Sequence, residues 1–514
     1  MSDPGLSRSV STAERLRHRR NAERRFKLYG QAAIGIAISF LVILLLSITI
    51  KASSAFTQHM VDVTLERPDF AEQTEFTVTE VNLAVRDHLL DVFPEASTAR
   101  STRADLFNIT TRLAVLPLRE RLSADPDLAL QPIQARLALS DDLDLYLKNE
   151  ISRHRSVRVG EAGRLSRSDT GFYRLTDAGP NGFVDFQDQV QDTVSDPQDI
   201  LISLGDAWFE LEGVTGAVLI LSHLAGPLPE LGEQASAPIR ATYLNSLSEN
   251  RRVSLRQIAI MLHLKDRGEI SRRFNSSLFV NADSTYPELA GVAAALIGSL
   301  FTMLITALFA LPVGVLAAVY LEEFARKSRL TSIIEVNINN LAAVPSIIFG
   351  LLGAAVFLNT FGLPRSVPFV GGLVLGLLVL PTIIIASRAA LRAVPPSVRD
   401  AALGLGASPT QTVFHHVLPL AAPGILTGAI IAMARALGET APLLLIGMVA
   451  FISEVPTSPN DEATVLPVLI YKWFSGAERA WEPMTSAVIL ILLTVLVAMN
   501  LIAVVLRRRF ERRW

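Results

Sequence analysis

Uninterrupted stretches of apolar residues are the strongest constraint on how this 514-residue chain can fold. Half of its residues are hydrophobic, and they gather in long runs without a charged side chain. About 20 consecutive apolar residues cross the hydrocarbon core of a bilayer as a helix. We therefore expect a mainly α, polytopic helical membrane protein, with six spans over residues 28–50, 289–321, 341–358, 369–387, 417–453 and 484–506.

The positions of the basic residues predict the orientation of these spans. Residues 1–27 are rich in arginine and precede the first span, and the last span is followed by Arg507 and a short basic tail, 508–514. Lys and Arg next to a span remain in the cytoplasm. Six spans place both ends of the chain on one side, so we expect both termini to be cytoplasmic. The charged start is too long for a cleavable signal peptide.

The segment between the first two spans, residues 51–286, is charged and mixed in pattern, and it is long enough to bury a core. Residues 82–93 and 132–147 are patterned as amphipathic helices. Residues 154–175 favour short strands and turns. Residues 216–224 are apolar but too short to span a bilayer, so they are expected to be a buried core element. We predict an extracytoplasmic domain of mixed α/β content inserted after the first helix.

Composition and motifs exclude several classes of function. The formal net charge is −2, without the basic excess of a nucleic-acid-binding protein. The chain has no cysteine, so it has neither disulfides nor thiolate metal sites. No phosphate-binding loop for ATP and no nucleophile motif is recognisable. His415 and His416 are adjacent and would point apart on a helix, so we expect no metal site and no catalytic residue.

One spaced motif lies between the fourth and fifth spans. An acid with two alanines is followed by a glycine four residues after the second alanine, and a Leu-Pro pair closes the segment. This pattern resembles the cytoplasmic coupling loop of binding-protein-dependent ABC importer permeases. Asp400 stands where the family usually has Glu, and His416 stands where an aliphatic residue is common. The resemblance assigns coupling to an ATPase, within loop 393–419, to Asp400, Ala401, Ala402, Gly406, Phe414, Leu418 and Pro419.

The local chemistry of this loop agrees with that role. Pro395 and Pro396 can open a short helix, and Gly404 and Gly406 allow a sharp turn after it. Ser408 can then cap a second helix. We expect two short helices at right angles that project from the membrane and dock on a soluble ATPase. The alternative is an ordinary loop that binds nothing.

Three apolar segments, residues 310–314, 341–350 and 432–444, resemble the phosphate-specific PstA-type branch of these permeases. The resemblance runs from Leu289 to the C-terminus. It implies a type I importer core over 287–507 in a bacterial inner membrane. Residues 51–286 resemble an extra N-terminal domain of some PstA-type chains, and its position suggests that it docks a binding protein.

Two charged residues interrupt the fifth span. Arg435 and Glu439 stand four apart, so they share one helix face and can pair. An ionisable residue at membrane depth usually faces a cavity or a partner. Arginine can bind two oxygens of an oxyanion at once, and Thr440 could add a hydroxyl donor. We hypothesise that these three residues line a phosphate path; a structural ion pair between helices is the alternative.

The resemblance implies a transport subunit and not an enzyme. Its expected partners are a second, PstC-like permease, a PstB-like ATPase dimer that carries ATP and Mg²⁺, an extracytoplasmic phosphate-binding protein and membrane lipid. No cofactor is expected in this chain. Two alternatives remain: a permease for another oxyanion such as sulfate or molybdate, and a membrane receptor that senses through residues 51–286 without transport.

Overall fold

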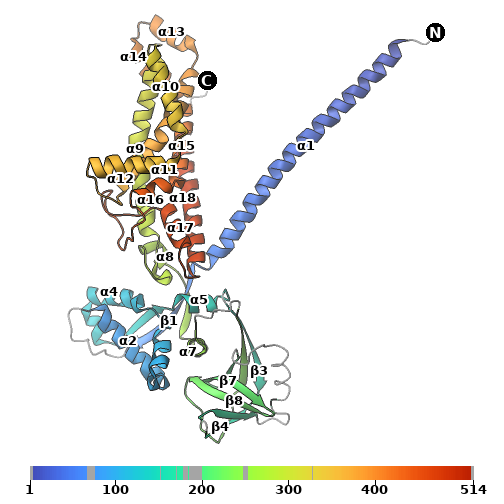
Figure 1. Cartoon of the computed structure of the whole chain (residues 1–514), viewed down its shortest axis with the longest axis vertical. Helices are drawn as coiled ribbons and strands as arrows, with labels where there is room; N and C mark the ends of the chain where they lie inside the picture. Colours follow the sequence, from blue (N-terminus) through green and yellow to red (C-terminus); the bar gives the residue numbers. More distant parts are fainter. Residues whose placement is uncertain are drawn as a thin grey trace.

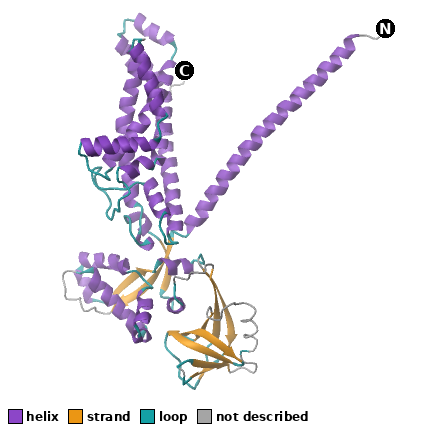
Figure 2. Cartoon of the chain, viewed as in Figure 1, coloured by secondary structure: helices purple, strands orange, loops and turns teal. Residues whose placement is uncertain are grey.

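The computed structural model describes residues 4–65, 76–150, 152–169, 171–177, 183, 200–246, 253–326 and 328–510. In this part of the chain a helical bundle stands on a domain of mixed α and β structure, which we call the inserted domain (Figures 1 and 2). The first helix, α1 (Pro4–Ser53), touches the bundle only near its C-terminal end and leaves it at an angle (Figure 1). Its apolar side chains from Leu28 to Ile50 are exposed except for the half-buried Ile48, as in a helix whose neighbours are lipid or another subunit.

Within the described residues, five helices are long and apolar enough to cross a membrane, or six if one bent pair counts as a single span. The prediction of several apolar spanning helices is confirmed. The five are α1, α9 (Ala293–Val319), α12 (Pro368–Arg392), α15 (Leu418–Gly438) and α18 (Trp481–Phe510).

The predicted third span, 341–358, is wrong as a single helix. The chain forms α10 (Arg329–Ala342), breaks, and continues as α11 (Ser346–Gly353) and a π-helical segment to Thr360, with a bend of 103°. Pro345 explains the break, because it cannot donate a backbone hydrogen bond and keeps the preceding residue out of the helical region.

The predicted fifth span, 417–453, is too long. Helix α15 ends at Gly438, and Glu439 is extended. Pro442 lacks the N–H that would bond the Gly438 carbonyl, so the helix cannot continue across it. A short helix, α16 (Ala441–Leu445), and a turn at Gly447 follow, and α17 (Leu466–Phe474) leads to α18.

Small residues set the distance between α12 and α15. Gly424 and Gly428 lie one helical turn apart on α15, opposite Ala390 and Ala386 on α12. A Cβ atom on Gly428 would lie 2.2 Å from the Ala386 Cβ. This is the close backbone approach by which helices associate in a membrane, where burial of apolar surface gives no drive between them.

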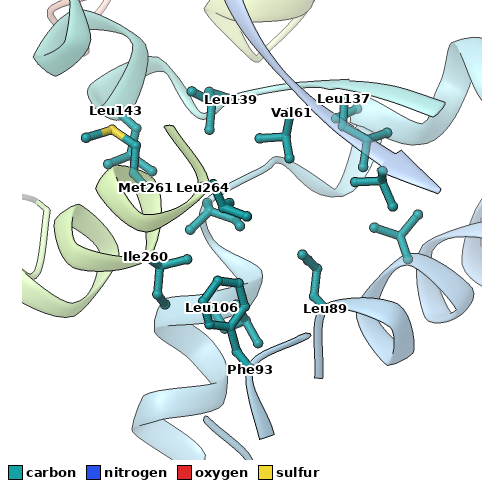
Figure 3. Close-up of a cluster of buried hydrophobic side chains, with 14 of the residues drawn as sticks. Val61, Leu89, Phe93, Leu106, Leu137, Leu139, Leu143, Ile260, Met261 and Leu264 are labelled. Carbon is teal, nitrogen blue, oxygen red and sulfur yellow. The ribbon is translucent and has the colours of Figure 1, made fainter. Parts of the chain in front are cut away.

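Two paired strands connect the inserted domain to the membrane helices. Strand β1 (Thr57–Leu65) follows α1, and β11 (Ile270–Phe274) precedes α8 (Ser277–Val280) and α9; the two run antiparallel with Thr57 opposite Phe274. With β2 (Ile133–Ala138) they make a sheet of order β11-β1-β2 among the described residues. Helices pack on this sheet around the apolar core drawn in Figure 3; they are α2 (Val78–Val92), α3 (Arg100–Phe107), α4 (Leu116–Ala124) and α5 (Asp141–Leu147).

The second lobe of the inserted domain is an antiparallel sheet, with described order β3-β10-β6-β7-β8-β5-β4-β9. Its strands are β3 (Ser152–Gly160), β4 (Gly163–Arg167), β5 (Tyr173–Asp177), β6 (Ile200–Leu204), β7 (Ala207–Thr215), β8 (Val218–Ala225), β9 (Gln234–Ala235) and β10 (Ile239–Ser246). Helix α7 (Leu255–Asp266) is buried from Gln257 to Leu264 and shares one core with both lobes, so the two lobes form one folded unit.

Most of the expected elements of this domain are confirmed. Helix α2 covers 82–92 with Phe93 as its C-cap, β3 to β5 lie over 154–175, and β8 (Val218–Ala225) is the core element expected at 216–224. The helix predicted at 132–147 is wrong in its first half, which is strand β2. Ile133, Ala135 and Leu137 are buried while the residues between them are exposed, which is the two-residue period of a strand.

Buried polar contacts fasten the inserted domain to the end of α1. The Lys148 ammonium is largely buried and donates to the backbone carbonyls of Ser54 and Thr57 at 2.7 and 2.5 Å, and also binds Asp144. Asp144 accepts from both the backbone N–H and the ring of His59. The end of α1 is therefore tied to α5 by charge-assisted hydrogen bonds.

A buried carboxyl lies at the same joint. Glu288 is 7% exposed, and its carboxyl oxygens have no well-formed hydrogen bond, although the Thr111 hydroxyl is near. Burial raises the pKa of Glu288 to about 8, and the neighbouring Asp141 adds to the rise. The folded protein thus keeps this proton to higher pH than the unfolded chain does.

The joint should weaken as the pH rises. Below the ordinary pKa of 4.5 both states bind the proton; above it only the folded state does, so stability falls until about pH 8. Glu288→Gln, a neutral mimic of the protonated acid, should remove this loss, of the order of a few kcal/mol. We expect thermal unfolding in detergent at pH 9 to occur at least about 5 °C higher in the variant. Glu212→Gln, at an exposed site on β7, is the control. Equal melting of Glu288→Gln and wild type at pH 9 would contradict the assignment.

Candidate functional site

The predicted coupling loop lies at the end of the bundle away from the inserted domain, beside the C-terminal end of α18 (Figure 1). It contains α13 (Pro396–Gly404) and α14 (Pro409–Thr412). Pro395 precedes the first helical residue, as expected. The loop is the part of the bundle farthest from the joint with the inserted domain.

Helix α13 ends at a tight turn that needs a glycine. Gly406 has φ +89°, and its N–H bonds the Leu403 carbonyl while the N–H of Ala407 bonds the Ala402 carbonyl. This pair of bonds is a Schellman motif, which satisfies carbonyls at the helix end and places the next residue in the left-handed region. Gly404 is still helical. Of the two glycines expected to turn the chain, Gly406 therefore makes the turn.

The second helix begins as predicted but is not short. The Ser408 hydroxyl accepts from Gln411 N–H, and the Gln411 side chain accepts from Ser408 N–H, which is a complete capping box. Helix α14 then runs through a π-helical turn, Val413–Val417, directly into α15, as one helical span from Pro409 to Gly438. The expectation of a second, separate short helix is wrong, and the loop is rigidly continuous with the fifth span.

The loop divides into a buried side and an exposed tip. Val413 and Val417 pack in a core with residues of α9 and α12, and Ala402 is buried. Leu405 is 91% exposed. The other exposed positions at the tip include Asp400, Ala401, Leu403, Gly406, Phe414 and Pro419, and Leu418 is half-buried. Most of the predicted coupling residues therefore share one solvent-facing tip.

Charged residues that sequence reasoning did not assign fasten this tip. The guanidinium of Arg399, next to Asp400, binds both carboxylate oxygens of Glu323 at 2.6 and 3.1 Å. Its hydrogen bonds to Glu323 raise the pKa of Arg399 above its ordinary value. Glu323 lies in the π-helical segment Tyr320–Phe324 that ends α9. The pairing joins residues 76 positions apart, so no local pattern could reveal it.

A second charged group lies beside the first. Arg388 of α12 contacts Glu335 of α10 at 2.6 Å and Glu322 at 3.3 Å, and Arg392 contacts Glu322 at 2.7 Å. These contacts join α9, α10 and α12 at the loop end of the bundle. The sequence showed these residues only as charges that flank spans.

The predicted path residues lie at the end of α15. Arg435 Nε and Glu439 Oε1 are 3.4 Å apart, so the two residues pair as predicted, and Thr440 follows at the break. Arg435 lies about 25 Å along the helix from Leu418, at 1.5 Å per residue. It is half-exposed, on the face of α15 that also carries exposed Ile431 and that borders the buried stripe with Ala432 and Ala436. The described part of this chain leaves that face uncovered.

No group of three or more His, Cys, Asp or Glu side chains in the described residues is placed to hold a metal ion. His415 and His416 instead line an open cleft of about 540 Å³ between α12–α13 and the start of α15, with mostly apolar walls that include Val394 and Pro419.

Comparison with known proteins matches the two parts of the chain separately. Residues 310–514 match the family model described as "binding-protein-dependent transport system inner membrane component". Residues 13–156 match a domain of unknown function, DUF3333; this range contains most of α1 and the elements from β1 to α5, and it ends within β3.

Curated relatives match the bundle closely. The phosphate transport system permease protein PstA 1 of Mycobacterium tuberculosis is 35% identical over 225 residues, 43% of this chain and 72% of that protein. The phosphate transport system permease protein PstA of Haemophilus influenzae is 34% identical over 211 residues, 41% of this chain and 73% of that protein.

Among solved structures, the MetNI methionine ABC transporter in an inward-facing conformation is 20% identical, with a TM-score of 0.35 over 43% of this chain and 94% of that chain. That likeness is too low to carry an argument. The identity to the PstA permeases over more than two thirds of their length carries the assignment. The chain belongs to the PstA-type phosphate permease family of ABC importers, multi-pass proteins of the inner membrane, and it carries an additional inserted domain.

Proposed function

We propose that this chain is the permease subunit of an ATP-driven phosphate importer. The observation that carries the proposal is the identity of its bundle to permeases named for phosphate transport over 72% of their length. The substrate is taken from these relatives. In this account the chain performs no chemistry: ATP and Mg²⁺ are bound by a PstB-like ATPase dimer, and the pathway lies between this chain and a second, PstC-like permease.

The exposed tip of the coupling loop is the surface that the ATPase would hold. Leu405 and Phe414 offer apolar contact, and Asp400 offers a charge beside them. A large apolar side chain that is 91% exposed at the end of a helix is typical of a surface that a partner covers. Because α14 continues into α15, a push on this tip moves the fifth span directly.

The same arrangement supports the orientation. The tip, the C-terminus and the N-terminal end of α1 lie toward one end of the molecule, and the inserted domain lies at the other (Figure 1). With the basic ends in the cytoplasm, the inserted domain stands outside, at the mouth of the bundle. There it is placed to meet an extracytoplasmic phosphate-binding protein, and the joint through Lys148 ties it to α1.

The pathway is proposed to follow the uncovered face of α15. Arg435 and Glu439 lie there, and a charge at this depth needs a cavity or a partner. Phosphate would meet the planar donors of Arg435 while Glu439 holds the side chain in place. ATP binding would reorient the spans around this point in an alternating-access cycle.

Uptake with competing anions tests the substrate. The chain, with the neighbouring permease and ATPase and the binding protein, is expressed in cells without their own phosphate importer, and uptake of labelled phosphate is measured. Excess arsenate should block uptake, because it shares the shape and charge of phosphate, and excess sulfate or molybdate should not. Transport of sulfate instead would keep the importer and overturn the substrate. An assembled complex that moves no anion would favour a receptor.

Arg435 should be needed for uptake and not for folding. Arg435→Ala removes the charged donors and should lower the specificity constant for phosphate about 10- to 100-fold, the value of one or two charge-assisted hydrogen bonds. Arg435→Lys keeps the charge but loses the two-pronged contact, so an intermediate loss is expected.

The control for this series is Arg508→Ala, an exposed residue at the end of α18. Membrane levels of each variant are measured by immunoblot, because a purely structural ion pair would lower the amount of protein. Normal uptake by Arg435→Ala at normal protein levels would remove Arg435 from the path.

A further inference from the structure

The side chain of Arg399 fastens α13 to two spanning helices at once. Besides its two bonds to Glu323, it donates to the Val394 carbonyl at 2.9 Å and to the Leu391 carbonyl at 3.0 Å. The Leu391 carbonyl belongs to the last turn of α12, the Val394 carbonyl belongs to the connection that follows it, and Glu323 belongs to the π-helical segment that ends α9. One guanidinium thus holds three segments together.

The hydrogen bonds of Arg399 are shielded from water and directional, so they resist movement of α13 relative to α9 and α12. Leu391 and Val394 are buried, and the Glu323 side chain is 9% exposed, so water competes poorly for the partners of Arg399. The last carbonyls of a helix have no partner within the helix and attract a positive charge. A two-pronged Arg–carboxylate contact also fixes the relative direction of its two segments.

The segments that Arg399 holds are themselves braced. Glu322, the neighbour of Glu323, binds Arg388 and Arg392 of α12, and Arg388 binds Glu335 of α10. The end of α9 is therefore fixed to α12 before Arg399 is added. To the apolar packing of Val398, Arg399 adds the polar attachment of α13, whose next residue, Asp400, lies at the exposed tip.

The two halves of the coupling loop are attached differently. Helix α14 is continuous with α15, so it needs no side-chain contact to move that span. Helix α13 is joined to α14 by the turn at Gly406 and to α12 by residues 393–395. Without Arg399, only the apolar packing of Val398 and Ala402 would resist rotation of α13 about these connections when the tip is pushed.

We propose that Arg399 is a positioning residue which, through Glu323, makes α13, α9 and α12 move as one body when the ATPase displaces the coupling loop. This inference rests on the proposed function for its driving force. Its geometric content, a rigid joint between α13 and α9, can be measured without phosphate.

Charge exchange tests the transport consequence. Complexes with the second permease and the ATPase are reconstituted in proteoliposomes with the binding protein, and phosphate moved per ATP hydrolysed is measured. Arg399→Glu and Glu323→Arg should each lower this ratio at least about tenfold, while ATP hydrolysis continues. The double exchange restores an ion pair and should recover most of the ratio. Arg326→Glu reverses an exposed charge near the same segment and should change nothing.

Spin labels test the joint itself. The chain has no cysteine, so Ser397→Cys on α13 and Tyr320→Cys at the end of α9 can be labelled alone. The distribution of distances between the two labels should be the same with ATP and with ADP. It should become broader when Arg399→Glu is added.

Three results would overturn the proposal: single variants with a normal transport ratio, a double exchange no better than either single variant, or a label distance that changes with nucleotide in the otherwise native chain. Failure of the proposed function looks different. In that case the unaltered complex moves no phosphate, while the label distance still depends on Arg399.

Discussion

The contact of α12 with α9 on one side and α15 on the other is the interaction on which the rest of the bundle depends. It is made by small residues: Gly424 and Gly428 of α15 lie against Ala390 and Ala386, and Gly314 of α9 lies against Ile383. Because lipid tails solvate apolar side chains as well as a neighbouring helix does, close approach and interhelical polar contacts hold the spans together. It brings the ends of three helices to one place, where the charged groups around Glu322 and Glu323 can meet.

The lipid environment also limits where the helices of the bundle can break. A backbone group in a membrane must find a partner in the protein, so non-helical backbone is tolerated only where other helices cover it or a cavity provides water. The bend between α10 and α11 and the end of α15 both come at a proline, and both are followed by short helices, α11 and α16, that pack on each other. The break after α15 is where Arg435, Glu439 and Thr440 lie. An interrupted helix therefore supplies both the polar groups and the irregular backbone of the proposed path.

The features that could be predicted from the sequence are those that depend on runs of similar residues or on the chemistry of neighbouring residues. Apolar length predicted the spanning helices, and the Ser408 and Gln411 pattern predicted its cap. The prediction of one helix over residues 132–147 was wrong, because a helix and a strand followed by a helix fit the same pattern there. Strand β2 ends at Ala138, and Ser140 then precedes helix α5. Contacts between distant residues were not predicted either. Arg399 and Glu323 are unremarkable charges in the sequence, and only the packing of α9 on α12 makes them partners.

The inserted domain can be added to such a bundle because the chain enters and leaves the domain through two adjacent strands. The first residue of β1, Thr57, pairs with the last residue of β11, Phe274, so the domain occupies no more room at the joint than a two-stranded stem. Lys148, Asp144 and Glu288 then make the joint polar and buried, which ties the domain to α1 and to the start of α9. A partner that binds this domain would therefore act on the spans through a firm connection.

The central claim is that the tip formed by α13 and α14 holds the ATPase. A single cysteine in place of Leu405, in a chain that otherwise has none, can carry a short photoreactive crosslinker in the assembled complex. The account predicts a crosslink to the ATPase that changes in yield with ATP. The same label in place of exposed Leu231 of the inserted domain should give none. A crosslink to the ATPase from position 231, or none from position 405 in an intact complex, would contradict it.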